Sequence, residues 1–149
     1  MIEFHPLKKS DIELIVPMME DFYAIDNYPI EAETTKKLFQ TFIENENFGN
    51  CWLISHDQII VGYVILTYMF SFEYQGKIAF LDELYLNENA RGKGIGKTTL
   101  EFVHDQAIQK ELKIIYLEIE SHNEVARKLY LSNDYIIHNR HLMKLTPKP

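Results

Sequence analysis

The sequence predicts one domain of the α/β class, an α+β fold built around a mixed sheet. Three observations support this prediction. Helical and strand-like hydrophobic periodicities follow each other along all 149 residues, with no linker, repeat or low-complexity tract between them. A strand, a turn with glycine at alternate positions and a helix come in that order within residues 80–103. Residues 113–118 (KIIYLE) read as a continuous apolar strand, which is typical of a strand buried on both faces of a parallel sheet.

Two helices are expected in the first third of the chain. The i, i+3, i+4, i+7 spacing of four apolar residues predicts the first helix, and these residues are Ile15, Met18, Met19 and Phe22. A second helix is predicted at residues 33–44, with an inward face that consists of Leu38, Phe39, Phe42 and Ile43. Acidic and aromatic side chains lie near the connection between the two helices, namely Glu20, Asp21, Tyr23, Asp26 and Tyr28. They form either a solvated edge or one wall of a substrate pocket, and the sequence leaves both interpretations open.

Runs rich in β-branched and aromatic residues predict the strands. These runs are residues 2–5, 51–55, 59–68, 77–86, 113–118, 135–138 and 141–145. The second and third runs form a hairpin in which Gly62 suggests a bulge, and the last two runs are expected to pair with each other. A helix follows the glycine turn, with an apolar stripe of Leu100, Val103, Ala107 and Ile108. A short final helix is expected to be capped by Ser121 or Asn123.

Composition and charge narrow the possible functions. The net charge of −7 argues against a general nucleic-acid binder. No stretch of about 18 apolar residues is present and the polar N-terminus does not resemble a signal peptide, so we expect neither a membrane anchor nor export. The one cysteine, Cys51, cannot form an internal disulfide and fits a reducing cytoplasm. No metal is expected, because His138 and His141 form only a pair of potential ligands without a third nearby.

The glycine turn has the properties of an anion-binding site. Gly92, Gly94 and Gly96 precede a helix whose first amides have no intrahelical partner and lie at the positive end of the helix dipole. Glycine allows a phosphate to approach the backbone closely. Arg91 and Lys93 add positive charge, which favours a polyanionic ligand such as a pyrophosphate over a single carboxylate. An ordinary tight turn is the plain structural alternative.

Two known phosphate-binding motifs each differ from this turn at one position. A dinucleotide fingerprint that starts at Gly92 requires glycine at position 97, where the chain has Lys97. A Walker A motif ending in 96–98 requires glycine at position 91, where the chain has Arg91. A third pattern matches fully: residues 91–96 (RGKGIG) resemble the [Q/R]-x-x-G-x-[G/A] pyrophosphate loop of the GNAT N-acetyltransferase superfamily.

Two further segments carry this resemblance, which covers nearly the whole chain. Residues 81–86 (LDELYL) look like the fourth strand of the superfamily. Residues 123–130 (NEVARKLY) look like its N-x-x-A-x-x-L-Y box. The Gly-Phe pair that usually follows this box is replaced by Asp134 and Tyr135. Loss of that glycine leaves the backbone conformation of this turn open, although aspartate adopts a positive φ more readily than most residues.

The resemblance implies a fold and a cofactor. The implied fold is a central, mostly antiparallel twisted sheet with helices on both faces, whose fourth and fifth strands splay apart to admit acetyl-CoA. By the same resemblance, the residues expected to bind acetyl-CoA are Leu84, Tyr85, Leu86, Arg91, Gly92, Lys93, Gly94, Ile95, Gly96, Lys97, Asn123 and Tyr130.

The resemblance also implies a reaction, namely direct transfer of an acetyl group to a primary amine of a small molecule or protein within a ternary complex. The backbone amide of Leu84 is the implied donor to the oxyanion, and Tyr130 is the implied acid for the departing thiolate. Asp82 or Glu83 would attract the amine and take its proton. They face opposite sides of a regular strand, so without a bulge only one reaches the amine, and we prefer Glu83.

Several alternatives stay open at this stage. The glycine turn also fits a P-loop-like nucleotide-binding module or a CoA-binding regulator without catalytic activity. Cys51 is expected to be a small core residue rather than a nucleophile. The identity of the amine is open, as is the choice between a monomer and a homodimer.

Overall fold

The computed structural model describes all of residues 1–149, which fall into two compact units, Met1–Glu118 and Ile119–Pro149. No helix in it is both long enough and apolar enough to cross a membrane. The first unit contains the whole sheet and three of the four α-helices. The second unit contains the remaining helix. The expectation of one domain for the whole chain stays a prediction.

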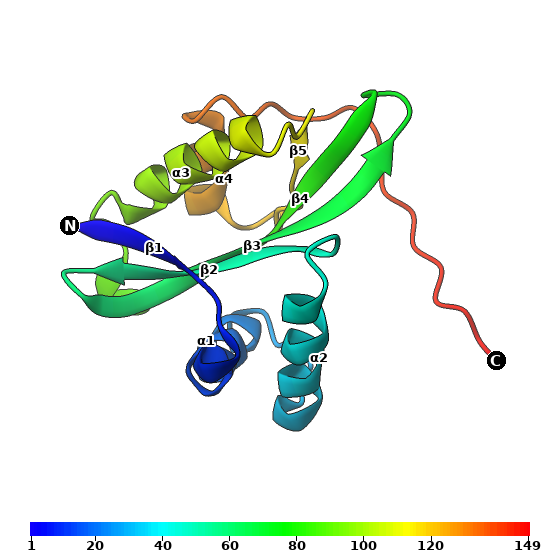
Figure 1. Cartoon of the computed structure of the whole chain (residues 1–149). Coiled ribbons are helices and arrows are strands. Elements are labelled where there is room, and N and C mark those ends of the chain that lie inside the picture. Colours follow the sequence, from blue (N-terminus) through cyan, green and yellow to red (C-terminus); the bar gives the residue numbers. More distant parts are fainter. The chain divides into compact units, whose positions relative to one another are not determined.

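A five-stranded sheet forms the centre of the first unit (Figure 1). Its strands lie in chain order, namely β1 (Ile2–Pro6), β2 (Gly49–His56), β3 (Ile59–Ser71), β4 (Gly76–Leu86) and β5 (Ile115–Tyr116). All neighbours are antiparallel except β4 and β5, which are parallel. The predicted mixed, mostly antiparallel sheet with helices is therefore confirmed.

The fifth strand is much shorter than the run of residues 113–118 that predicted it. It pairs with β4 only through Ala79 with Ile115 and Phe80 with Tyr116. Beyond Phe80, β4 continues to Leu86 and pairs only with β3. The apolar run predicts a buried strand correctly, but it carries no information on how far the neighbouring backbone stays within hydrogen-bonding distance.

Helices cover both faces of the sheet. After a short 3₁₀ turn (Lys9–Asp11), α1 (Ile12–Ile25) and α2 (Ala32–Glu44) lie on one face, and α3 (Ile95–Gln109) lies on the other (Figure 1). Strand alternation separates the two packing layers. Cys51 and Leu53 of β2 belong to the core beneath α1 and α2. Trp52, between them, packs edge-on against Phe102 of α3, with ring centroids 5.2 Å apart.

Two apolar residues that the helical periodicity places inward are exposed instead. Leu38 of α2 is 62% exposed and Ile108 of α3 is 65% exposed. In α2 only Thr35 and Phe39 are buried. Each helix therefore contacts the sheet through a narrower stripe than its apolar spacing indicates. The periodicity identifies the side that faces the sheet but not the width of the contact.

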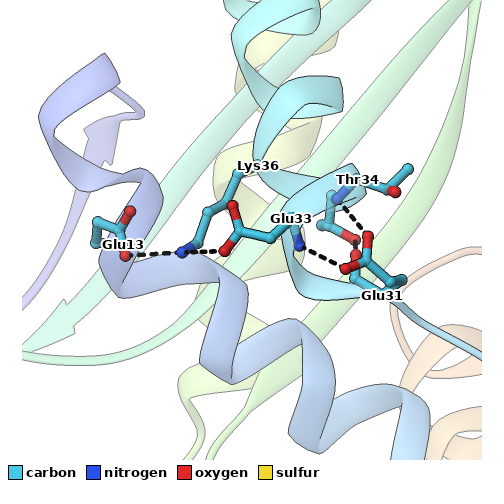
Figure 2. Close-up of polar contacts among 6 residues, drawn as sticks. Glu13, Glu31, Glu33, Thr34 and Lys36 are labelled. Atoms are coloured by element: carbon cyan, nitrogen blue, oxygen red, sulfur yellow. Dashed lines mark hydrogen bonds and ion pairs between the residues drawn. The ribbon is translucent and has the colours of Figure 1, made fainter.

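The start of α2 is fixed by charged side chains that Figure 2 shows together. The Glu31 carboxylate accepts hydrogen bonds from the backbone amides of Glu33 (3.2 Å) and Thr34 (2.6 Å), and so caps the helix. Lys36 lies one turn further along, with its Nζ 3.2 Å from Glu13 of α1 and 3.1 Å from Glu33. The exposed carboxylates make this bridge between α1 and α2 a weak one.

The second unit contains α4 (Glu124–Leu131). Of the two expected caps, Asn123 is the one used, since its Oδ1 accepts a hydrogen bond from the Ala126 amide at 3.0 Å. Asp134 has φ 68°, the left-handed conformation that a glycine would favour. The ring of Tyr135 packs edge-on against Tyr130, 5.4 Å between centroids.

The predicted strand pair at residues 135–138 and 141–145 is wrong, because neither segment forms a strand. Apolar residues in both segments are exposed, namely Ile136, Ile137, Leu142, Met143 and Leu145. Local sequence gives these segments a preference for extended backbone. An isolated two-stranded pair is at best marginally stable in water, so strand propensity without a buried face does not suffice.

Candidate active site

A β-bulge in β4 places two carboxylates at the same cavity. Glu83 pairs with Ile65 and Leu81 with Leu66, so Asp82 has no counterpart on β3. An extra residue of this kind interrupts the regular alternation of side chains. Asp82 and Glu83 therefore both line a cavity of about 390 Å³. The sequence-based inference that only one acid faces a given site assumed a regular strand, and the bulge removes that condition.

The cavity lies among residues of α1, α2, the connection between them, β3 and β4. It is lined by Met19, Tyr23, Pro29, Ile30, Glu31, Thr34, Thr35, Leu38, Phe39, Phe42, Ile65, Thr67, Asp82 and Glu83. Of the five acidic and aromatic residues suggested as a pocket wall, Tyr23 alone takes part in the lining. Tyr23 thus lines a cavity, and its place in the wall of a substrate pocket stays a prediction; the apolar part of the lining was not anticipated.

Glu83 is held by two tyrosine hydroxyls. Tyr23 donates to Oε2 and Tyr63 donates to Oε1, each at 2.8 Å. Burial raises the pKa of Glu83, the two hydroxyl hydrogen bonds oppose that rise, and the charge of Asp82 adds to it. The pKa of Glu83 is raised overall. No sequence motif identifies Tyr63, because its contact with Glu83 depends on the register between β3 and β4.

Asp82 has a different environment on the same bulge. Its side chain is the more exposed of the two and has no hydrogen-bond partner within the protein. Partial burial of the carboxylate and, secondarily, the negative charge of Glu118 raise its pKa. A carboxylate with a raised pKa and free lone pairs is suited to accept a proton. The two acids thus differ in their surroundings: Glu83 is held by two hydrogen bonds, and Asp82 is not.

Cys51 lies in the core beneath this site and does not act as a nucleophile candidate. Its side chain is 6% exposed, and burial followed by the negative charge of Glu83 strongly raises the pKa of the thiol. A thiol in such surroundings stays protonated and unreactive. The prediction that Cys51 is a small core residue is confirmed.

The open edge of β4 presents backbone donors next to the acids. Successive amides along a strand point to opposite sides, and the Asn87 amide donates toward β3, to the Val61 carbonyl at 2.8 Å. By alternation the amides of Leu84 and Leu86 face away from β3, where β5 does not pair. The amide of Tyr85 faces β3 and its side chain is buried in the core. This geometry supports Leu84 and Leu86, and not Tyr85, as backbone donors to a ligand.

The glycine turn follows β4 after a 3₁₀ turn (Glu88–Ala90). Gly92 and Gly94 have φ of 73° and 79°, so both adopt the left-handed conformation. A Cβ at either position would meet no atom within 4 Å, so the backbone surface of the turn is open. The first amide to bond back into α3 is that of Thr98, to the Gly94 carbonyl at 3.1 Å. The amides of the first helical turn before it are free for an anion.

The basic residues of the turn have distinct surroundings. Arg91 donates from Nε to the Leu86 carbonyl at 2.9 Å, and its guanidinium carbon lies 6.0 Å from the centre of the Tyr85 ring. Lys97 lies 3.9 Å from Glu101 on the exposed side of α3. Open amides, two left-handed glycines and nearby basic side chains fit the pyrophosphate of acetyl-CoA, which is the group implied by the sequence.

Asn123 and Tyr130 belong to the second unit. Asn123 uses its side-chain oxygen as the cap of α4, which leaves its amide nitrogen for other contacts. Burial raises the pKa of Tyr130 to about 12, so its phenol keeps its proton at neutral pH. Their roles toward a ligand of the first unit remain predictions.

The sheet, the open strand edge and the glycine turn together define an acyltransferase of the N-acetyltransferase type. A model of the acetyltransferase (GNAT) family matches residues 15–135, so the chain belongs to this family and is an N-acetyltransferase. The uncharacterized N-acetyltransferase YhfO of Bacillus subtilis (strain 168) is 28% identical over 129 residues, which cover 86% of this chain and 85% of that protein.

Solved structures agree on the fold. An integron cassette protein from the mobile metagenome of Cole Harbour Salt Marsh has a TM-score of 0.87 at 25% identity, covering 98% of this chain and 91% of that one. A structure from Clostridium acetobutylicum, described as a predicted acetyltransferase with acetyl-CoA, has a TM-score of 0.81 at 14% identity, covering 97% and 96%. At this identity the second similarity concerns the fold alone.

Proposed function

We propose that the chain transfers an acetyl group from acetyl-CoA directly to a primary amine, within a ternary complex. The observation that carries this proposal is the bulge in β4, which brings Asp82 and Glu83 to one cavity. The same strand has an open edge at Leu84 and Leu86 and leads into the glycine turn. Amine-attracting groups and a pyrophosphate-binding turn are thus joined by one short segment.

The proposed roles begin at the amine. An alkylamine with a pKa of about 10.4 is almost wholly protonated at neutral pH and cannot attack until it loses a proton. Glu83, fixed by two tyrosine hydroxyls, holds the cation, and Asp82 accepts the proton because its lone pairs are free. This assignment reverses the preference for Glu83 that the sequence suggested.

The remaining roles concern the acetyl group. Bound acetyl-CoA would supply the acetyl group as an activated thioester. The Leu84 amide donates to the oxygen that becomes negative in the transition state, which is where such a donor acts most strongly. The glycine turn from Arg91 to Lys97 holds the pyrophosphate. Tyr130 donates its phenolic proton to the departing sulfur, and Asn123 contributes a contact to CoA.

A thiol-release assay tests this proposal. Acetyl-CoA and a panel of primary amines should give free thiol at a rate that depends on the amine, with an equimolar acetylated amine detected by mass spectrometry. Cys51→Ala should retain turnover. An acetylated enzyme that forms without amine, or thiol release that no amine increases, would contradict direct transfer. ATP with Mg²⁺ should not compete with acetyl-CoA, whereas a nucleotide-binding module would show such competition.

A further inference from the structure

The composition of the cavity restricts the amine that it can accept. Half of its lining is apolar, namely Met19, Pro29, Ile30, Leu38, Phe39, Phe42 and Ile65. The polar lining consists of Tyr23, Thr34, Thr35, Thr67, Glu31, Asp82 and Glu83. No lysine, arginine or histidine is part of it. The cavity therefore offers an apolar surface and negative charge, with no group to pair with an anion.

The negative charge available to a ligand comes from adjacent residues of β4. Both oxygens of Glu31 are engaged by the amides of Glu33 and Thr34 (Figure 2). Hydrogen bonding from the Thr34 side chain, and then from these amides, lowers the pKa of Glu31. The neighbouring cation, Lys36, is directed to Glu13 and Glu33 and does not line the cavity. Asp82 is the carboxylate left without a hydrogen bond. Glu83 accepts the two tyrosine hydroxyls and is the neighbour of Asp82 on β4, so its negative charge acts at the same place.

The composition of the cavity wall accounts for the exposed position of Leu38. The side chain is 62% exposed, although helical spacing places it with the inward residues of α2. It lies on the wall of the cavity together with Phe39 and Phe42 of the same helix. A bound apolar group would cover part of this wall, and removing this apolar surface from water favours binding.

We propose that the acetyl acceptor is a small monoamine with an apolar body, such as an aryl-alkyl or alkyl amine. This inference rests on the proposed function, because it assumes that the cavity receives the acceptor. The amine lies at Asp82 and Glu83, and the aryl or alkyl group lies against Ile30, Leu38 and Phe42. A volume of about 390 Å³ is near the lower end of small-molecule pockets, which suits a body of one ring or a short chain.

Two classes of amine are disfavoured for the same reasons. A free amino acid would bring a carboxylate next to Asp82 and Glu83 with no cation to pair with it. A diamine or an aminoglycoside would place a second ammonium or several hydroxyls against the apolar wall. Burying such a group without a partner is costly.

Matched substrates test the proposal in the wild-type enzyme. 2-Phenylethylamine and phenylalanine differ by one carboxylate, and hexylamine and 1,6-diaminohexane differ by one amine. We expect kcat/KM for acetyl transfer to be at least about 10-fold higher for the monoamine of each pair. Equal or better turnover of phenylalanine or 1,6-diaminohexane would overturn the inference while acetyl transfer to amines still stands. Absence of amine-dependent thiol release with every amine would overturn the proposed function as well.

A pair of variants tests the location of the apolar body. Leu38→Ser should raise KM for 2-phenylethylamine about 10-fold and change kcat little, because it removes apolar contact without touching the acids. Ile108→Ser is the matched control, since Ile108 is 65% exposed on α3 and lies outside the cavity. The control should leave KM unchanged. Identical kinetics of the two variants would overturn the assignment of this cavity to the acceptor.

Discussion

At the scale of single residues, the two carboxylates of β4 show how neighbours in sequence acquire different surroundings. Glu83 has both oxygens occupied by Tyr23 and Tyr63, whereas Asp82 has no hydrogen-bond partner. Partial burial and the charge of Glu118 raise the pKa of Asp82 above its ordinary value. As the solution is acidified, a base with a raised pKa becomes protonated at a higher pH than a base with an ordinary pKa. It then can no longer accept a proton from the amine. The acidic limb of the pH profile therefore reports on the residue that takes the proton.

The first prediction compares the two acids. Asp82→Asn should lower kcat about 10²- to 10⁴-fold near neutral pH and remove the acidic limb of the kcat profile. Glu83→Gln should mainly raise KM for the amine and leave that limb in place. The measurement is kcat and KM for the amine from pH 5 to 9, with the amine concentration varied at saturating acetyl-CoA. If Glu83→Gln removes the limb and Asp82→Asn does not, the roles of the two acids are exchanged.

The second prediction concerns Tyr130. Burial raises the pKa of this phenol to about 12, so it is protonated throughout the range in which the enzyme would operate. As the acid for the departing thiolate it should contribute about 10²- to 10⁴-fold in rate. Tyr130→Phe should lower kcat by that factor and change the Kd of acetyl-CoA little, as measured by calorimetry. Tyr135→Phe is the matched control on the partner ring, and an equal loss in both variants would indicate a packing role instead.

Sequence reasoning succeeded at this scale where a residue type has a strict local requirement. The cap at Asn123 and the left-handed Asp134 follow from the chemistry of a helix start and of a turn. The hydroxyls that hold Glu83 could not be foreseen in the same way. Tyr63 reaches Glu83 because β3 and β4 pair in one register, and register is set by the whole sheet rather than by nearby sequence.

At the scale of elements, the order and type of most helices and strands could be predicted, but their limits and contacts could not. Periodicity indicates which face of α2 or α3 is inward. How much of that face is covered depends on the sheet below, and this is why Leu38 and Ile108 are exposed. β5 is short for a related reason, since its length depends on where β4 diverges from it.

The third prediction concerns the turn before α3. Acetyl-CoA at a hundredfold excess over its Kd should stabilise the protein by about 2.7 kcal/mol, or roughly 5–10 °C in Tm. Gly94→Leu and Gly94→Asn should both abolish this increase, because a side chain would occupy the open surface of the turn. Without ligand, the leucine variant should have the lower Tm, since asparagine adopts a positive φ more readily. A normal increase in the leucine variant would exclude this turn as the pyrophosphate site.

At the scale of the whole molecule, the residues with proposed roles are found in both compact units. The acids, the strand edge and the glycine turn belong to Met1–Glu118, whereas Asn123 and Tyr130 belong to Ile119–Pro149. The family model extends over both units, since it matches residues 15–135. Acetyl-CoA should therefore affect residues that the first unit does not contain.

The fourth prediction follows from this distribution. Hydrogen exchange of the amides in α4 should slow when acetyl-CoA is added, if Asn123 and Tyr130 contact the ligand. The α1 and α2 amides serve as the internal reference, because the proposed cofactor contacts do not include them. Exchange takes place in the intact protein and is measured by mass spectrometry of the peptides after digestion. Unchanged exchange in α4 at saturating acetyl-CoA would contradict a contact of Asn123 and Tyr130 with the cofactor.

The bulge at Asp82 also makes β4 tolerant to a change in chain length. Leu81 and Glu83 lie opposite Leu66 and Ile65, which are consecutive, so deleting residue 82 would leave an uninterrupted ladder with every core side chain on its present face. We expect the deletion variant to fold with a Tm close to that of the wild type and to be as inactive as Asp82→Asn. Loss of the fold, seen by circular dichroism, would contradict this. In evolutionary terms, one codon could then be gained or lost at this position without a change in the rest of the sheet. The gain or loss of that codon would add or remove the proposed base of the reaction.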